Sequence, residues 1–352
     1  MDEKPTRQHQ RQQPKRRIGP TLLVIVLTSL ALVAGYAARI YTQTKNAVGK
    51  TYDPVSSKVV KKTTIKADKP LSFLLLGTDT GEFGRKEVGN SDTMIVVTLN
   101  PKANRTTMTS IPRDTLAEIV GGGPTSYQKI NAAYALGGNV AAMQTVTKLL
   151  NVPFNYYVTV NMAGLEKIVD AVGGIDVNVK FSWQDPDSGN LKFTKGPMHL
   201  NGKWALSYAR MRHQDSDYGR QQRQQEVITQ IVKKILSAKS LSNYSTLMDS
   251  LADSMRTSLT FDEMVQIAQQ YSDCIKHVKQ ATLQGMGAYI GTGAYQIPTT
   301  KAMQTASDNI RAELGLAPET LNTYNVKQNA LNTQHGFNWN DGNNPTYTLY
   351  PN

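Results

Sequence analysis

One run of apolar residues constrains the fold of this chain more than any other feature. The run extends from Leu71 to Leu76 and ends at Gly77. A strand that is apolar at nearly every position is typical of a sheet covered on both faces, so it predicts an α/β fold. Asp79 lies just past the carboxyl end of this strand, where open α/β sheets bind ligands. The alternative is an ordinary aspartate in a turn between glycines.

Two more strands are predicted after it, over residues 94–99 and 105–111, and the Asn- and Pro-containing turn between them favours a hairpin. A hairpin would bring Asp92, at the start of one strand, close to Arg113 and Asp114, at the end of the other. Carboxylates without a histidine cluster suit Mg²⁺ or Mn²⁺, which take oxygen ligands and complete their shell with phosphate and water. A structural ion pair between Arg113 and Asp92 is the alternative.

A second concentration of charge lies between Tyr208 and Gln225. Arg210 and Arg212 are two residues apart, so in an extended segment both side chains leave the same face. Arg220 and Arg223, from the start of the next helix, would complete a pocket suited to phosphate or pyrophosphate. The alternative is a solvated basic face.

The remaining pattern predicts a layered α/β/α domain with a mixed central sheet over residues 69–319. Strands over 156–160 and 175–179 enclose a helix over 162–172, which predicts a βαβ unit. This helix and the one over 132–150 either line a groove for a lipid tail or pack in the core, and the core is the favoured interpretation. Further elements are expected at 241–254, 261–271 and 299–314 as helices and at 278–283 as a strand. Residues 320–352 are rich in Asn, Thr, Tyr and Gly and predict a flexible polar tail.

The amino-terminal residues predict a membrane anchor. Residues 1–17 carry six Lys or Arg against two acids and predict a basic cytoplasmic tail. Residues 18–38 contain no charged residue, and this span is long enough for one transmembrane helix. A cleaved signal peptide is the alternative, but the apolar span is longer than usual for one. A stalk over residues 39–68 would then lead to an extracellular domain. Cys274 is the only cysteine, so no intramolecular disulfide can form.

The charge balance points to an anionic partner. The formal net charge is +12, of which residues 1–17 contribute +4, so the rest of the chain carries +8. A basic domain outside a membrane favours lipid headgroups or a phosphate-rich polymer. Nucleic acid is disfavoured, because no helix-turn-helix, zinc-finger or RNP pattern is present.

Seven motifs, taken in order, resemble the LytR-CpsA-Psr family between about residues 71 and 236. They are Gly77-x-Asp79, Ser91-Asp92-Thr93-Met94, Ser110-Ile111-Pro112-Arg113-Asp114, Lys129-Ile130-Asn131-Ala132-Ala133-Tyr134, Val169-Asp170-x2-Gly173-Gly174, His199-Leu200-Asn201-Gly202, and Tyr-Ala-Arg-x-Arg followed by Arg-Gln-Gln. The resemblance implies a membrane-anchored, extracellular phosphotransferase of Gram-positive-type cell walls. It would move a glycopolymer, such as wall teichoic acid or capsule, from a polyprenyl pyrophosphate carrier to peptidoglycan.

The resemblance also implies roles for individual residues. The positions that match metal and pyrophosphate sites are Asp79, Asp92, Arg113, Lys129, Arg210, Arg212, Arg220 and Gln224, with Arg223 beside them. Asp79 and Asp92 would hold the metal, Mg²⁺ or else Mn²⁺, and these two with Arg113, Arg210 and Arg212 would be catalytic. Asn90 stands where many relatives have arginine, so no cationic contribution is expected there.

Two other functions remain open from the sequence. A noncatalytic receptor could grip an anionic wall polymer with the same arginines, and a pyrophosphatase could use water in place of the sugar hydroxyl. A nucleophilic hydrolase and a zinc enzyme are disfavoured, because no Gly-x-Ser-x-Gly elbow and no ligand spacing of the five histidines is present. The general base is left unassigned.

Overall fold

A computed structural model describes most of the chain. It covers residues 38–39, 41–43, 45–56, 60, 64–79, 89–121, 123, 126–237, 251 and 253–351. The chain divides into two units, Met1–Gln43 and Thr44–Asn352. The predicted basic tail and, apart from Ala38, the predicted membrane span lie outside the described residues, as does most of the helix predicted over 241–254. Among the helices that are described, none is long and apolar enough to cross a membrane.

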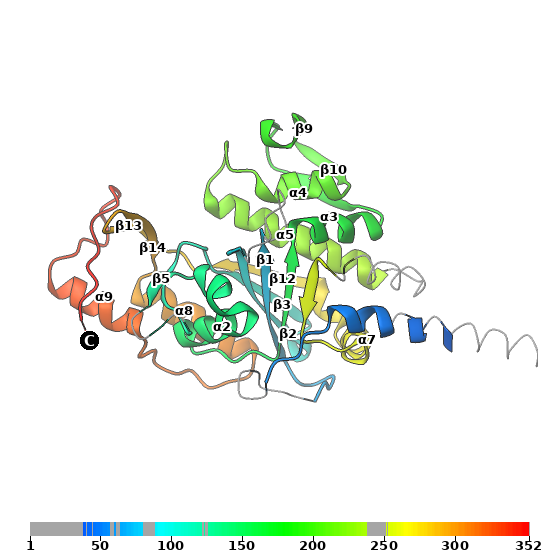
Figure 1. The fold of residues 1–352 in the computed structure, drawn as a ribbon, viewed down its shortest axis with the longest axis horizontal. Helices are drawn as coiled ribbons and strands as arrows, with labels where there is room; N and C mark the ends of the chain where they lie inside the picture. The colour runs from blue at the N-terminus through cyan, green and yellow to red at the C-terminus, as the bar shows by residue number, and fades with distance from the viewer. Residues whose placement is uncertain are drawn as a thin grey trace, which may run out of the picture. The chain divides into compact units, whose positions relative to one another are not determined.

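A mixed sheet of six strands forms the centre of the second unit, as predicted (Figure 1). Its order is β11 (Met255–Thr257), β6 (Tyr156–Asn161), β1 (Leu71–Thr78), β2 (Ser91–Asn100), β3 (Arg105–Ser110) and β12 (His277–Thr282). β1 runs parallel to β6 and β12 runs parallel to β3, while the other neighbours are antiparallel. The three strands predicted first are confirmed, and β2 and β3 form the expected hairpin.

Both faces of this sheet are covered, which explains the apolar character of β1. Leu74 and Leu76 face a cluster that includes α2 (Ala132–Leu150) and α8 (Thr300–Glu313). Leu71 and Phe73 face the opposite cluster, against α7 (Phe261–Gln270). Alternate side chains of one strand therefore enter two different apolar layers. α7 begins with a capping box between Thr260 and Glu263.

The two helices considered for a lipid groove contribute to hydrophobic clusters, as the favoured interpretation expected. α2 buries Ala142, Met143 and Val146 in the cluster beneath the sheet, and it is kinked at Gly137 and Gly138. α3 (Met162–Ala171) packs in a separate cluster through Val169.

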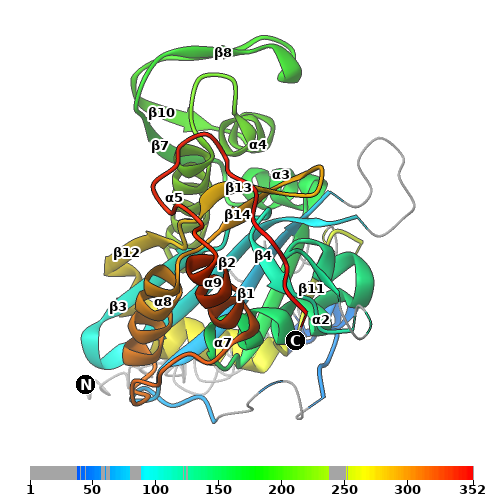
Figure 2. The same cartoon turned by 90° about the vertical axis from the view of Figure 1, so that its left-hand side faces the viewer.

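The predicted βαβ unit is wrong. β7 (Ile175–Val179) does not join the central sheet but pairs with β10 (Gly196–Leu200) in a two-stranded sheet of its own. With α3, α4 (Gly202–Arg210) and α5 (Asp217–Ser237), this hairpin forms a module at one end of the central sheet (Figures 1 and 2). The small sheet β8 (Trp183–Asp185) and β9 (Leu191–Phe193) belongs to it. The burial along β7 alternates, so only one of its faces packs on a core. A strand inside the central sheet, which is covered on both faces, would be buried on both sides.

Two of the family-like motifs hold this module together. The backbone N–H of Gly202 donates a hydrogen bond of 2.7 Å to Asp170 Oδ1, which ties the start of α4 to the end of α3. A side chain at Gly202 would collide with the Glu166 carbonyl at 2.3 Å. These motifs therefore position helices rather than supply reactive groups.

The carboxyl-terminal residues differ from the flexible tail predicted for 320–352. They form α9 (Tyr324–Gln334) and then return past β13 (Met286–Ile290) and β14 (Gly293–Ile297). The core they build is partly polar, because the buried side chains of α9 include Asn325, Gln328, Asn329 and Asn332, which donate hydrogen bonds to backbone carbonyls. A polar composition therefore concealed a packed segment.

The other short elements connect these layers. They are the strands β4 (Leu116–Glu118) and β5 (Tyr127–Lys129) and the 3₁₀ turns η2 (Pro101–Ala103), η3 (Pro186–Ser188) and η4 (Ser272–Lys276). β4 pairs with β5, which places Lys129 opposite Leu116. Residues 45–51, within the predicted stalk, are helical, and Ala47 and Val48 are buried.

Candidate active site

Three strand ends bring the predicted carboxylates to one edge of the sheet. Asp79 follows the carboxyl end of β1, and Asp92 lies near the start of its antiparallel neighbour β2. Gly77 pairs with Thr93 and Thr78 with Ser91, so the register shifts at Asp92. Such a β-bulge redirects a side chain and is common beside active sites. Asp79 and Asp92 therefore lie at the same rim because β1 pairs with β2.

Glycine is required beside Asp79. A Cβ atom at Gly89 would lie 1.9 Å from Asp79 Oδ1. We expect Gly89→Ala to displace this carboxylate and to lower activity by about tenfold to a hundredfold, since small misplacements of reacting groups are costly. The melting temperature should change little, because the displaced carboxylate can rotate. A steady-state rate equal to that of the wild type would show that the position of Asp79 is not important.

Arg113 links a row of alternating charges along this rim. Its Nη1 lies 2.8 Å from Asp92 Oδ1 and its Nε lies 3.5 Å from Asp114 Oδ2. Lys129 Nζ lies 2.7 Å from Asp114 Oδ1. Burial by itself would lower the pKa of the Arg113 guanidinium, but the hydrogen bond to Asp92 and the neighbouring carboxylates outweigh burial and raise the pKa. The ion pair between Arg113 and Asp92 considered from the sequence is therefore present.

The first turns of α5 are held against the same edge. Gln225 Nε2 donates hydrogen bonds to Ser110 Oγ at 2.8 Å and to the Ala281 carbonyl at 2.9 Å. These acceptors belong to β3 and β12 near their carboxyl ends. Gln224 is half-buried on the same helix, four residues after Arg220, so the two share a face. The sequence did not single out Gln225, since nothing in the motif distinguishes an anchoring glutamine from its neighbours.

Arg220 is a buried cation with unused hydrogen-bonding capacity. Its side chain is 5% exposed, and Nη2 lies 3.1 Å from Asp217 Oδ1. Its Nε and Nη1 atoms are buried and have no hydrogen-bond partner among the residues that the structure describes. Burial lowers the pKa of Arg220, as do the nearby charges of Arg212 and Arg113, while Asp217 and Asp92 raise it. The arrangement suits an anionic ligand with several oxygen acceptors.

Arg223 differs from Arg220 because the protein uses its whole guanidinium group. Nε donates to the Tyr208 carbonyl at 2.9 Å, Nη2 donates to the Met211 carbonyl at 2.6 Å, and Nη1 pairs with Asp215. These bonds fix the segment that carries Arg210 and Arg212. Both of these side chains are exposed on either side of buried Met211. Arg210 is the last residue of α4, so the two arginines do not share the extended segment that the sequence analysis assumed.

Loss of Arg223 is expected to destabilise the fold. Arg223→Ala would leave Asp215 and two buried carbonyls without their partner, so we expect the free energy of unfolding to fall by about 3–5 kcal/mol in urea denaturation. Burial raises the pKa of Asp215, but the hydrogen bonds from Arg223 and Ser216 outweigh burial and lower it below 3.8. The contribution of the pair is therefore complete above pH 3.8 and is lost as the pH falls through the lower folded-state pKa. An unchanged urea midpoint at pH 7 would contradict this role.

The carboxylates can contribute to a metal site but do not form a complete one. No group of three or more His, Cys, Asp or Glu suited to a metal occurs among the described residues. Asp79 and Asp92 supply oxygen ligands at one rim, and a hard divalent cation can take its remaining ligands from phosphate and water. The donor set therefore fits magnesium with a bound phosphate.

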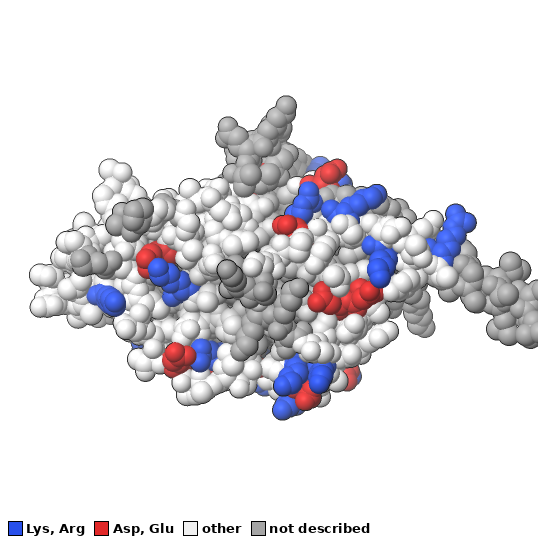
Figure 3. All heavy atoms as spheres, turned by 60° about the horizontal axis from the view of Figure 1, so that its bottom comes forward, with Lys and Arg blue, Asp and Glu red and all other residues white. Residues whose placement is uncertain are grey.

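One face of the molecule carries charges of both signs. On the face drawn in Figure 3, Lys and Arg atoms lie beside Asp and Glu atoms in small mixed groups. At the site, by contrast, Arg113 and Arg212 both lie close enough to Arg220 to lower its pKa.

The comparison with known proteins decides the family. The LytR_cpsA_psr family model matches residues 37–312. The chain belongs to the LytR-CpsA-Psr family. Among its LytR-CpsA-Psr relatives is the polyisoprenyl-teichoic acid–peptidoglycan teichoic acid transferase TagU of Enterococcus faecalis, which is 40% identical over 301 residues, 85% of this chain and 98% of the relative.

Solved structures support the same relationship. A Streptococcus agalactiae protein superposes on this LytR-CpsA-Psr chain with a TM-score of 0.70 at 37% identity, over 81% of this chain and 100% of that chain. TagT bound to LIIa-WTA superposes with a TM-score of 0.61 at 28% identity, over 72% of this chain and 94% of that chain.

Proposed function

We propose that this protein transfers an anionic glycopolymer from a polyprenyl pyrophosphate carrier to peptidoglycan and joins the two by a phosphodiester. The named relatives include teichoic acid transferases that use peptidoglycan as acceptor. The observation that carries the proposal is Arg220, a buried guanidinium with two unpartnered nitrogen atoms beside Arg113 and Arg212. A pyrophosphate would supply the missing acceptors and balance the converging charges.

The residues would divide the work as follows. The acceptor hydroxyl gives its proton to a base, which stays unassigned, and attacks the phosphorus that bears the glycopolymer. The bond to the bridging oxygen breaks, and polyprenyl phosphate leaves with that electron pair. Arg113, Arg212 and Arg220 would stabilise the charge that develops on the phosphate oxygens. Arg210 and Lys129 would bind the outer phosphate oxygens, and Gln224 would donate a hydrogen bond from the same face of α5.

Two further features belong to the proposal. Asp79 and Asp92 would hold Mg²⁺ or Mn²⁺, which would neutralise the leaving phosphate. Residues 18–38 would anchor the chain in the membrane with the domain outside, so that a lipid-linked donor is presented at the membrane surface. Arg223, predicted beside the pyrophosphate residues, would position Arg210 and Arg212 instead of binding phosphate itself.

The direct test is a transfer assay with the full-length protein in detergent. A short-chain polyprenyl pyrophosphate glycan, peptidoglycan oligomers and Mg²⁺ would be incubated with it, and mass spectrometry would follow the products. A phosphodiester-linked adduct that is lost in Arg210→Ala is expected. Release of lipid phosphate without an adduct would indicate a pyrophosphatase, and binding without turnover would indicate a polymer receptor. Either of these results would overturn the proposal.

A further inference from the structure

The carboxyl-terminal residues form an aromatic structure that the family match does not include. The family model ends at residue 312, whereas α9 and the returning segment lie beyond it. Tyr127 and Tyr324 stack with their ring centroids 3.6 Å apart. Phe337, Trp339 and Tyr347 meet edge to face, with Phe337 4.9 Å from Trp339. So dense a group of rings gives this part of the fold rigid walls.

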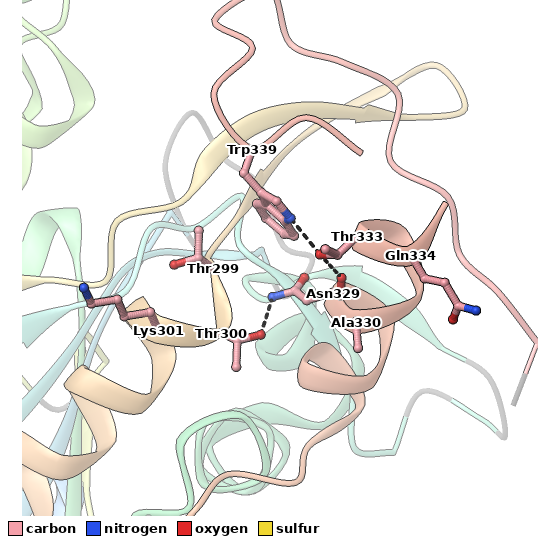
Figure 4. A pocket seen from close by; sticks show the side chains of 8 residues that line it. All are labelled: Thr299, Thr300, Lys301, Asn329, Ala330, Thr333, Gln334 and Trp339. Carbon is pink, nitrogen blue, oxygen red and sulfur yellow. Dashed lines mark hydrogen bonds between the residues drawn. The ribbon is translucent and has the colours of Figure 1, made fainter. Parts of the chain in front are cut away.

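A cavity of about 540 Å³ opens beside this group, between the start of α8 and α9 (Figure 4). It is broadly open to solvent, and most of its exposed lining surface is apolar. Its lining includes Thr299, Thr300, Lys301, Asn329, Thr333 and Trp339. Lys301 is the one charged residue of the lining, so the cavity does not suit a pyrophosphate.

The indole of Trp339 is fixed over this cavity. Its Nε1 donates a hydrogen bond of 2.9 Å to Thr333 Oγ1, and the Thr333 hydroxyl donates to the Asn329 carbonyl at 2.8 Å (Figure 4). The buried Asn329 amide donates to the Pro298 carbonyl at 3.0 Å and to Thr300 Oγ1 at 3.4 Å. Because the indole is half-buried, part of its ring remains available to a ligand. A held aromatic ring beside hydroxyl groups binds with little loss of conformational entropy.

This combination matches a sugar ring. One face of a pyranose carries C–H groups, which an indole can cover, and its rim carries hydroxyl groups that need both donors and acceptors. Thr299 and Thr300 offer hydroxyls that serve as either. With Lys301 as its single cation, the lining is compatible with a neutral amino sugar or with a sugar that carries one carboxylate.

The cavity is connected to the active site through β14. The N–H of Gln296 donates to the Asp114 carbonyl at 2.9 Å, and the ring of Tyr295 lies 5.7 Å from Lys129 Nζ. β14 ends at Ile297, and Thr299 on the cavity wall follows two residues later. A polymer held in the cavity is therefore tethered close to the charged rim, which raises its effective concentration there.

We propose that this cavity binds a sugar unit of the acceptor glycan strand, an uncharged or singly charged amino-sugar polymer, as a second contact outside the active site. The choice of ligand rests on the proposed function, but the binding requires no phosphotransfer. The pocket would act on the Michaelis constant for a polymeric acceptor and not on the chemical step.

The test compares binding and transfer in full-length protein. A soluble tetrasaccharide, prepared by digesting peptidoglycan, is titrated while tryptophan fluorescence and calorimetry are recorded. We expect Trp339→Ala to weaken binding by about tenfold. Thr300→Val, which leaves the indole bonded to Thr333, should also weaken binding, so the result does not depend on one substitution that could loosen the tail. For transfer to long peptidoglycan strands, the Michaelis constant should rise about tenfold with kcat unchanged.

The outcomes separate the pocket from the active site. Arg220→Met should bind the tetrasaccharide as tightly as the wild type, so its binding survives even if the proposed transfer activity fails. The inference would be overturned if the wild type failed to bind the tetrasaccharide. It would also be overturned if Trp339→Ala and Thr300→Val both bound the tetrasaccharide with the affinity of the wild type. Binding of purified teichoic acid alone would overturn it as well, because that result would assign the pocket to the donor polymer.

Discussion

Arg220→Met is expected to lower the rate of glycopolymer transfer by about a hundredfold to a thousandfold while leaving the protein at least as stable as the wild type. The loss follows from removing a preorganised cation aimed at the phosphate oxygens. Stability should not fall, because among the described residues two of the buried guanidinium nitrogens find no partner and the third pairs with Asp217, which is 59% exposed. Replacing a poorly compensated buried charge by an apolar side chain of similar length is often neutral or stabilising. Transfer rates and urea denaturation would be measured on the same preparation.

Arg311→Met is the matched control. Arg311 is also a largely buried helical arginine, but Nη1 donates to the Asn151 carbonyl at 2.8 Å, Nε donates to the Ala317 carbonyl at 2.9 Å, and Nη2 lies 2.8 Å from Glu319. Its loss should lower the free energy of unfolding by about 3 kcal/mol and leave the transfer rate unchanged. If Arg220→Met behaved like this control, the arginines would form a structural network and the active-site interpretation would fail.

Asp92→Asn is expected to remove metal activation. Asparagine keeps the shape of the side chain but lacks the charge that a hard divalent cation requires. We expect transfer at saturating Mg²⁺ to fall by about a hundredfold to a thousandfold. Direct binding of Mn²⁺, followed by electron paramagnetic resonance, should weaken in parallel, which provides a measurement that does not depend on activity.

The control for this substitution is Asp273→Asn. Asp273 also pairs with a cation, Lys276 at 2.6 Å, but the pair is exposed and lies in η4. Neither Mn²⁺ affinity nor transfer should change in this variant. If Asp92→Asn bound Mn²⁺ as tightly as the wild type, Asp92 would be excluded from the proposed metal site. Its ion pair with Arg113 would then be a structural contact.

Much of the site could be predicted because it depends on local order along the chain. Buried strands are readable from apolar runs, and a short turn dictates that β2 and β3 pair as a hairpin. Once they pair, Asp92 and Arg113 must meet at one edge, and their measured separation of 2.8 Å agrees.

The errors concern contacts between segments that are distant in sequence. The strand over 175–179 was assigned to the main sheet because a βαβ unit is the commonest use of such a pattern, yet it pairs with β10. Arg223 could not be distinguished from Arg220 by spacing, since what separates them is the set of carbonyls that surround each guanidinium. The polar composition of the segment 320–352 predicts a flexible tail. Its side chains nevertheless find hydrogen-bond partners, because folding brings distant segments beside them.

The sequence by itself determined the family, the central strands and the chemical nature of the site. Apolar periodicity and ordered motifs are local properties of the chain, so they can be recognised before the fold is known. Only the tertiary structure decided that Arg223 supports the segment of Arg210 and Arg212, that β7 pairs with β10, and that Trp339 lines a pocket. These outcomes depend on burial and on hydrogen bonds across long sequence separations. The role of a buried arginine follows from which acceptors the fold brings within hydrogen-bond distance of it.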